Sequence, residues 1–243
     1  MDRGSINRRS LLQAGGVAAA AAACSNLVPT RCGQKEIQDS TRRSGPAESF
    51  AADLDISLKT TPKQVAILPG NPTECWTFDG EVSYGDPRAL ETLGPSTYLG
   101  PTIRVKRGQK VRIRFTSGIP EPSIVHWHGL HVPAEMDGHP RFAIPRGKTF
   151  VYEFEVRNRP GTYWYHSHAD VLTGPQVYRG LAGLFIVSDS EEDVLALPRG
   201  AFDVPLVVQD RLFDGDNQLL YVNRGMQMMT GFLGNRILVN GNN

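Results

Sequence analysis

The chain has 243 residues, of which 40% are hydrophobic and 21% are charged. This composition predicts a soluble protein with a packed core and excludes both a disordered chain and a collagen-like fibre. With 26 basic and 25 acidic residues, the net charge of +1 gives no broad field that would attract nucleic acid or an anionic membrane.

The first 24 residues have the features of an export signal. Arg8 and Arg9 precede a weakly apolar stretch, residues 14–23, which ends in alanines suited to cleavage. This order predicts a twin-arginine signal, which carries folded proteins to the periplasm or another extracytoplasmic space. A membrane anchor is the alternative, but a spanning helix needs about 20 strongly apolar residues. We therefore expect no transmembrane span.

Three cysteines are too few to build a disulfide-based fold. Cys24 follows a run of alanines that resembles a bacterial lipoprotein cleavage box, so a lipid anchor at this residue is an alternative. If Cys24 is lipidated, Cys32 and Cys75 remain either as a disulfide pair or as two free thiols. Residues 25–61 are polar without a sustained apolar period, which predicts a flexible tether.

Residues 62–190 have the pattern of an all-β domain, because short apolar or alternating segments are separated by turn residues. Residues 103–106 and 111–115 alternate between apolar and polar side chains, and residues 150–156 do so again. Residues 184–187 are continuously apolar and predict a central strand. We expect a Greek-key β-sandwich or barrel.

Two regions fit this pattern less well. Residues 84–95 contain Gly-Asp-Pro and predict a loop insertion with a short helical piece at 88–93. Beyond residue 190, strand-like segments occur at 204–208 and 237–239, with too few residues to pack a core of their own. Residues 191–243 are therefore expected to be a linker and the start of a truncated second domain.

All six histidines lie between His126 and His168, and four of them form two His-X-His units. Residues i and i+2 of a strand point to the same face about 6.5 Å apart, so two neighbouring strands would present a floor of four imidazoles. Four neutral imidazoles are poor core material, because each needs a hydrogen-bond partner and their protonated forms repel. A bound metal resolves both problems. The units are His126-Trp127-His128 and His166-Ser167-His168.

The spacing within each pair suits two metals at least as well as one, and imidazole suits zinc, copper, iron and nickel alike. The alternative for these histidines is that they cap strand ends and satisfy backbone groups. His131 and His139 lie off the shared faces, and we expect them at the surface or beside the site. The aromatic residues of the two motifs are expected to pack rather than to carry electrons. Packing is likewise preferred over cuprous-ion binding for Met226, Met228 and Met229.

Several motifs together resemble one known family. They are His-Trp-His-Gly-Leu at 126–130, Gly-Thr-Tyr-Trp-Tyr-His-Ser-His at 161–168, Pro-Thr-Ile at 101–103 and Arg-Gly-Leu-Ala-Gly at 179–183. This set resembles the first cupredoxin domain of multicopper oxidases. Residues 203–211 and 237–241 resemble the passage from the first to the second cupredoxin domain in three-domain bacterial members, such as copper-efflux, spore-coat or bilirubin-type oxidases.

The resemblance implies copper as the cofactor and a role for each matching residue. His126 would bind the type 2 copper of a trinuclear cluster. His128 and His166 would bind one copper of the type 3 pair, and His168 would bind the other. Asp137 matches an acidic position that helps to deliver protons to oxygen, although a turn-forming Asp-Gly is an equally open alternative.

The type 1 copper site of the family has no counterpart here, because no cysteine is flanked by histidines and no histidine follows His168. The chain would supply half of the cluster's histidines, so we expect an N-terminal fragment that needs missing C-terminal domains and is inactive alone. The full-length enzyme would oxidise cuprous ion, a phenol or a bilirubin-like compound and reduce dioxygen to water.

Two other function classes remain open. One is a stand-alone exported copper-binding domain without oxidase activity. The other is a structural protein, similar to those relatives that keep the fold, lose the copper ligands and act in cell division. The four histidines in their two pairs argue against the second alternative.

Overall fold

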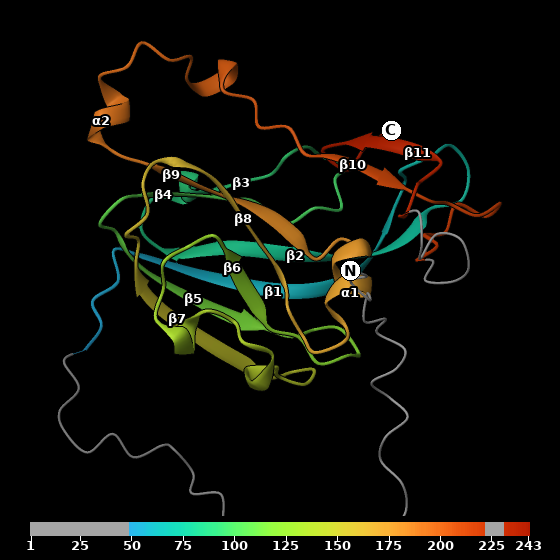
Figure 1. Ribbon diagram of the computed structural model, residues 1–243, viewed down its shortest axis with the longest axis horizontal. Helices are drawn as coiled ribbons and strands as arrows, with labels where there is room; N and C mark the ends of the chain where they lie inside the picture. The colour runs from blue at the N-terminus through green and yellow to red at the C-terminus, as the bar shows by residue number, and fades with distance from the viewer. Residues whose placement is uncertain (1–48, 222–230) are drawn as a thin grey trace, which may run out of the picture. The chain divides into compact units, whose positions relative to one another are not determined.

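The computed structural model describes residues 49–221 and 231–243. The predicted export signal, the lipid-anchor candidate Cys24, most of the predicted tether and the three methionines 226, 228 and 229 lie outside this part of the chain. Within it, most regular structure is β-strand, as predicted, and helices are short (Figure 1). No helix among the described residues is both long and apolar enough to cross a membrane.

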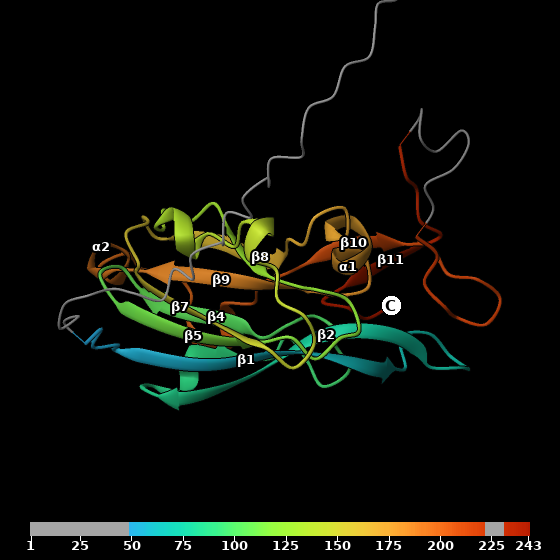
Figure 2. The same cartoon turned by 90° about the horizontal axis from the view of Figure 1, so that it is seen from below.

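Two β-sheets pack against each other (Figures 1 and 2). One has the strand order β2-β1-β5-β7 and the other the order β3-β4-β9-β8-β6. The pairs β1–β5 and β4–β9 are parallel, and the other pairs are antiparallel. The strands are β1 (Leu54–Val65), β2 (Thr73–Tyr84), β3 (Leu90–Glu91), β4 (Thr102–Lys106), β5 (Lys110–Thr116), β6 (Val125–His128), β7 (Thr149–Glu155), β8 (Gly161–Ser167) and β9 (Ala182–Ser188).

The core lies between the sheets, because alternate side chains of each strand point inward. In β5, Val111, Ile113 and Phe115 are fully buried, which agrees with the alternation read from the sequence. In β6 and β8, the inward-facing residues are Trp127 and Tyr165, both fully buried. Their sequence neighbours therefore point to the opposite face of the sheet, and these neighbours are His126, His128, Trp164 and His166.

The C-terminal boundary of the predicted tether is wrong. Strand β1 begins at Leu54, inside the segment 25–61 that was expected to be a tether. Leu54, Ile56 and Leu58 are buried, while the residues between them are polar. Because polar residues make up half of this alternation, the segment is polar on average, and a prediction based on composition does not identify the strand. Pairing with β2 on one side and β5 on the other makes it part of the sheet.

Two further elements differ from expectation. The helical piece predicted at 88–93 is a single 3-10 turn, Pro87–Ala89, followed by β3. The apolar run at 204–208 contributes only its last residue to strand β10 (Val208–Arg211), because only this part pairs with β11 (Arg236–Val239). The remaining helices, α1 (Thr173–Tyr178) and α2 (Ser190–Asp193), are each shorter than two turns.

Strands β10 and β11 form a separate two-stranded sheet (Figure 1). Phe213 and Leu238 pack with Val65, Cys75 and Tyr98, so this sheet shares an apolar cluster with the ends of β1 and β2. Burial raises the pKa of the Cys75 thiol to about 12, which keeps it protonated at neutral pH. Its candidate disulfide partner, residue 32, lies outside the described residues.

Candidate metal centre

The two histidine pairs share one face of the five-stranded sheet. Strands β6 and β8 are antiparallel neighbours, and their register places His126 opposite His166 and His128 opposite Trp164. His168 follows directly after the end of β8. The prediction that it lies in a strand is therefore wrong. The backbone N–H of His168 donates to the carbonyl of Ile124 over 2.8 Å, which holds this residue beside β6.

The four imidazole rings form one compact group. From the ring centroid of His126, the centroids of His128, His166 and His168 lie at 5.5, 5.4 and 5.1 Å. Ligand atoms of His126, His128 and His166 all lie within 4.8 Å of one another. The sequence therefore located a real cluster, and the strand pairing brings its two halves together.

Two ring nitrogens of the cluster, one from His128 and one from His166, lie within hydrogen-bonding distance of each other. Nδ1 of His128 lies 3.2 Å from Nε2 of His166. In tetrahedral zinc sites imidazole nitrogens bind at about 2.0–2.1 Å, which separates two ligand atoms on one metal by about 3.3 Å. The spacing of these two nitrogens therefore fits ligation of a single ion.

Backbone carbonyls fix the orientation of two rings. Nδ1 of His126 lies 2.7 Å from the carbonyl oxygen of Asp137, and Nδ1 of His166 lies 2.8 Å from that of Ser167. Because a carbonyl only accepts hydrogen bonds, each Nδ1 carries the proton and each Nε2 keeps its lone pair. This arrangement is typical of metal-binding histidines, whose second nitrogen donates to a carbonyl or carboxylate.

Burial favours the neutral form of two rings of the cluster. It lowers the pKa of His166 to about 4, against a smaller opposing effect of the Ser167 carbonyl. Burial also lowers the pKa of His168, and the charge of His126 lowers it further. Both rings are therefore neutral at pH 7, the form that offers a lone pair to a metal.

One polar atom of the cluster has no partner within the described part of the chain. It is Nδ1 of His168, which is buried without a hydrogen bond. Leaving such an atom unpaired costs about 1–3 kcal/mol, so a ligand role for this ring is physically sensible. An all-imidazole donor set fits copper, and it fits zinc, iron and nickel as well.

Asp137 lies in a turn, as one interpretation of its Asp-Gly sequence predicts, and its side chain lies beside His126. It ends a 3-10 turn, Ala134–Met136, and is followed by Gly138 at φ +74°. Its carboxylate Oδ1 also lies 3.2 Å from Nδ1 of His126, and the side chain is 44% exposed. The turn is thus what places the carboxylate next to the cluster while leaving it open to water.

Two buried networks hold the strands that carry the histidines, and neither was identified from the sequence. The hydroxyl of Tyr152 accepts from the N–H of Val125 and donates to its carbonyl, both over 2.9 Å. Ser167 lies 3.1 Å from the hydroxyl of Ser123 and donates to the side chain of buried Gln176. These contacts fix the start of β6 and the end of β8, where a sequence pattern gives no signal.

The remaining two histidines stand apart from the cluster of rings, as expected. The backbone N–H of His131 donates to the side chain of Asn158. Nδ1 of His139 accepts from the backbone N–H of Arg141 and so caps a 3-10 turn, Pro140–Phe142. Both side chains are exposed.

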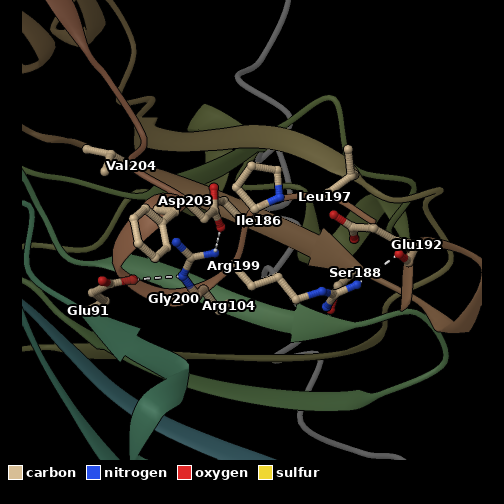
Figure 3. A pocket seen from close by; sticks show the side chains of 12 residues that line it. Glu91, Arg104, Ile186, Ser188, Glu192, Leu197, Arg199, Gly200, Asp203 and Val204 are labelled. Atoms are coloured by element: carbon tan, nitrogen blue, oxygen red, sulfur yellow. Dashed lines mark hydrogen bonds and ion pairs between the residues drawn. The ribbon is translucent and has the colours of Figure 1, made fainter. Parts of the chain in front are cut away.

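A cavity of about 630 Å³ lies elsewhere, where residues 197–204 pass over β4 and β9 (Figure 3). Arg104 is its central cation and is neutralised by Glu91 at 2.7 Å and Asp203 at 3.1 Å. Arg199 pairs with Asp193 at 2.9 Å. None of the four clustered histidines lines this cavity.

Comparison with known proteins points to one family. The family model described as "Multicopper oxidase" matches residues 92–192. The multicopper oxidase mco of Staphylococcus aureus is 36% identical over 62% of this chain and 33% of its own length. The cell division protein FtsP of Sodalis glossinidius is 31% identical over 98% of this chain and 46% of its own length.

Solved structures agree with these sequence relatives. The multicopper oxidase McoA of Aquifex aeolicus superposes with a TM-score of 0.65 and 33% identity. The match covers 79% of this chain and 40% of McoA. The chain therefore spans less than half the length of each of these relatives.

Proposed function

This chain belongs to the multicopper oxidase family and has its cupredoxin-like fold, and on that premise we propose that it supplies four histidines to a trinuclear copper cluster. The observation that carries the proposal is the single face on which the four rings meet, with Nδ1 of His128 and Nε2 of His166 3.2 Å apart. His126 would bind a type 2 copper. His128 and His166 would share one type 3 copper, and His168 would bind the other.

The complete protein would oxidise a small reducing substrate in one-electron steps and reduce dioxygen to water. Bound copper supplies the redox chemistry. The substrate classes that we propose are cuprous ion, phenols and bilirubin-like compounds. Domains that lie beyond this chain in its relatives would supply the type 1 copper and the other half of the cluster's histidines.

The protein groups around the cluster would orient the histidine rings and supply protons. The carbonyls of Asp137 and Ser167 fix the tautomers of His126 and His166 and so direct each Nε2 toward the copper. The carboxylate of Asp137 would take protons from water at its exposed side and pass them toward dioxygen.

An Asp137→Asn variant separates the proton role from the turn role. Asparagine also forms the turn, so the backbone carbonyl keeps its bond to His126 and copper content should stay unchanged. Loss of the acid should lower the rate of oxygen reduction by the copper-loaded complete protein by about 10²-fold. Copper content and oxygen uptake are measured on the same samples. Equal rates for the variant and the wild type would leave Asp137 with the turn role alone.

The proposed function as a whole is tested by oxygen consumption with a phenol. The 243-residue chain alone is expected to bind copper weakly and incompletely and to consume no oxygen, since half of the cluster's ligands are missing. Joined to domains equivalent to those that follow the matched region in its relatives, it should bind a full set of coppers and consume oxygen. Robust consumption by the chain alone would contradict the proposed fragment role.

A structural role in cell division is the second candidate, because the Sodalis relative that matches 98% of the chain is named a cell division protein. Negligible copper uptake by the complete protein would favour this role. Full copper uptake without oxygen consumption would instead favour an exported copper-binding domain. For each of these functions we propose export by the twin-arginine route. As an alternative, the exported protein would carry a lipid anchor at Cys24.

A further inference from the structure

Four neighbouring positions on the outer face of β6 and β8 form a rectangle. His126 and His166 are paired across the strands, and His128 and Trp164 are the next pair. Three corners of this rectangle are thus imidazoles, and the fourth is an indole. Trp164 also precedes His166 by two residues on the same strand, so both side chains point to the same face.

The indole of Trp164 contacts both imidazoles of the pair His128 and His166. Its ring centroid lies 4.8 Å from that of His128 with an interplanar angle of 27°. The corresponding values for His166 are 4.3 Å and 31°. The pair with His128 is stacked and the pair with His166 is tilted, and aromatic pairs of this kind contribute about 0.5–1.5 kcal/mol beyond area burial.

Core packing does not account for this tryptophan. The side chains that flank it in β8 are Tyr163 and Tyr165, and the latter is fully buried in the core together with Trp127. Trp164 points the other way and keeps 37% of its surface exposed. Trp164 borders an apolar hollow together with Leu184 and Leu206, and the aromatic rings that it contacts are those of His128 and His166.

We propose that Trp164 is a positioning residue that holds His128 and His166 in the orientation that ligates one metal ion. This inference rests on the proposed function. A flat ring that lies against both imidazoles restricts their rotation about χ2 before the metal binds, which lowers the ordering cost of binding. Outer groups that orient metal ligands typically change affinity by about 10–100-fold when they are removed.

The test is a titration of the full 243-residue chain with Cu²⁺ in competition with a chelator, together with the electron paramagnetic resonance spectrum of the bound ion. Trp164→Leu and Trp164→Gln remove the stacking ring and should weaken binding by about 10-fold, with altered hyperfine splitting. Trp164→Phe keeps an aromatic face and should bind within about 3-fold of the wild type. Tyr84→Leu, at a 65% exposed aromatic on β2, is the matched control.

The outcomes separate the two proposals. If the wild-type chain binds no copper, the proposed function fails. If the wild type binds copper and either non-aromatic variant folds with the wild-type affinity and spectrum, the positioning role is overturned. Melting temperatures without metal should fall by a few degrees in Trp164→Leu and Trp164→Gln, because each lost ring contact contributes about 0.5–1.5 kcal/mol. Loss of copper affinity in these two folded variants with an altered spectrum, and recovery of both in Trp164→Phe, supports the inference.

Discussion

Replacing His166 by alanine is expected to weaken copper binding by at least about 100-fold, since loss of an orienting group alone costs about 10–100-fold. His166 is paired with His126 across the strands, and its Nε2 lies 3.2 Å from Nδ1 of His128. The variant therefore removes the proposed ligand atom that lies nearest to His128. Because burial already lowers the pKa of His166 to about 4, the ring is neutral and needs no proton released before it binds.

His131→Ala is the matched control for this experiment. It removes a histidine from the same part of the sequence, but an exposed one whose recorded hydrogen bond is made by its backbone N–H. Copper affinity is measured by competition with a chelator for both variants, and circular dichroism reports their folding. Equal affinities for His166→Ala and His131→Ala would show that the cluster does not use His166 as a ligand.

Replacing Gly138 by alanine is expected to destabilise the protein by about 2–5 kcal/mol, the combined cost of left-handed backbone and of overpacking. Gly138 has φ +74°, and a Cβ atom at this position would collide with the backbone carbonyl of Val125. Either β6 or the turn must then move. Because the same turn carries the carbonyl that orients His126, copper affinity should fall as well.

Gly147→Ala separates these two costs. Gly147 has φ +80°, but a Cβ atom there would meet nothing within 4 Å, so only the left-handed backbone is penalised, at about 1–2 kcal/mol. Urea unfolding of both variants gives the free energies, and copper titration follows on the folded protein. If Gly138→Ala lowers the free energy of unfolding by no more than Gly147→Ala does, the close approach of the turn to β6 adds nothing to the cost of the substitution.

Much of the site was accessible from the sequence because its signal is local. The spacing of two residues in His126-Trp127-His128 predicts that two imidazoles share one face of a strand. This prediction does not depend on the rest of the fold. The same reasoning gave the alternating strands β4, β5 and β7. It could also have identified Trp164, which precedes His166 by two residues and so lies on the same face. The sequence analysis assigned it to packing because aromatic residues are most often core residues.

Other features depend on contacts between residues far apart in the chain. The boundary of β1 at Leu54 is set by pairing with β2 and β5, and its polar alternate residues conceal it in the sequence. Likewise His168 reaches the cluster only through a hydrogen bond to Ile124, after its strand has ended. Local patterns carry no information on such pairings.

By itself, the sequence determined an all-β chain with two histidine pairs, the family that they resemble and copper as the metal that the resemblance implies. The tertiary structure alone decided that β6 and β8 are neighbours, that His126 faces His166 and that Asp137 lies against the first pair. The physical reason is that side-chain direction follows from the local backbone period. Strand order and register instead follow from the packing of the whole core.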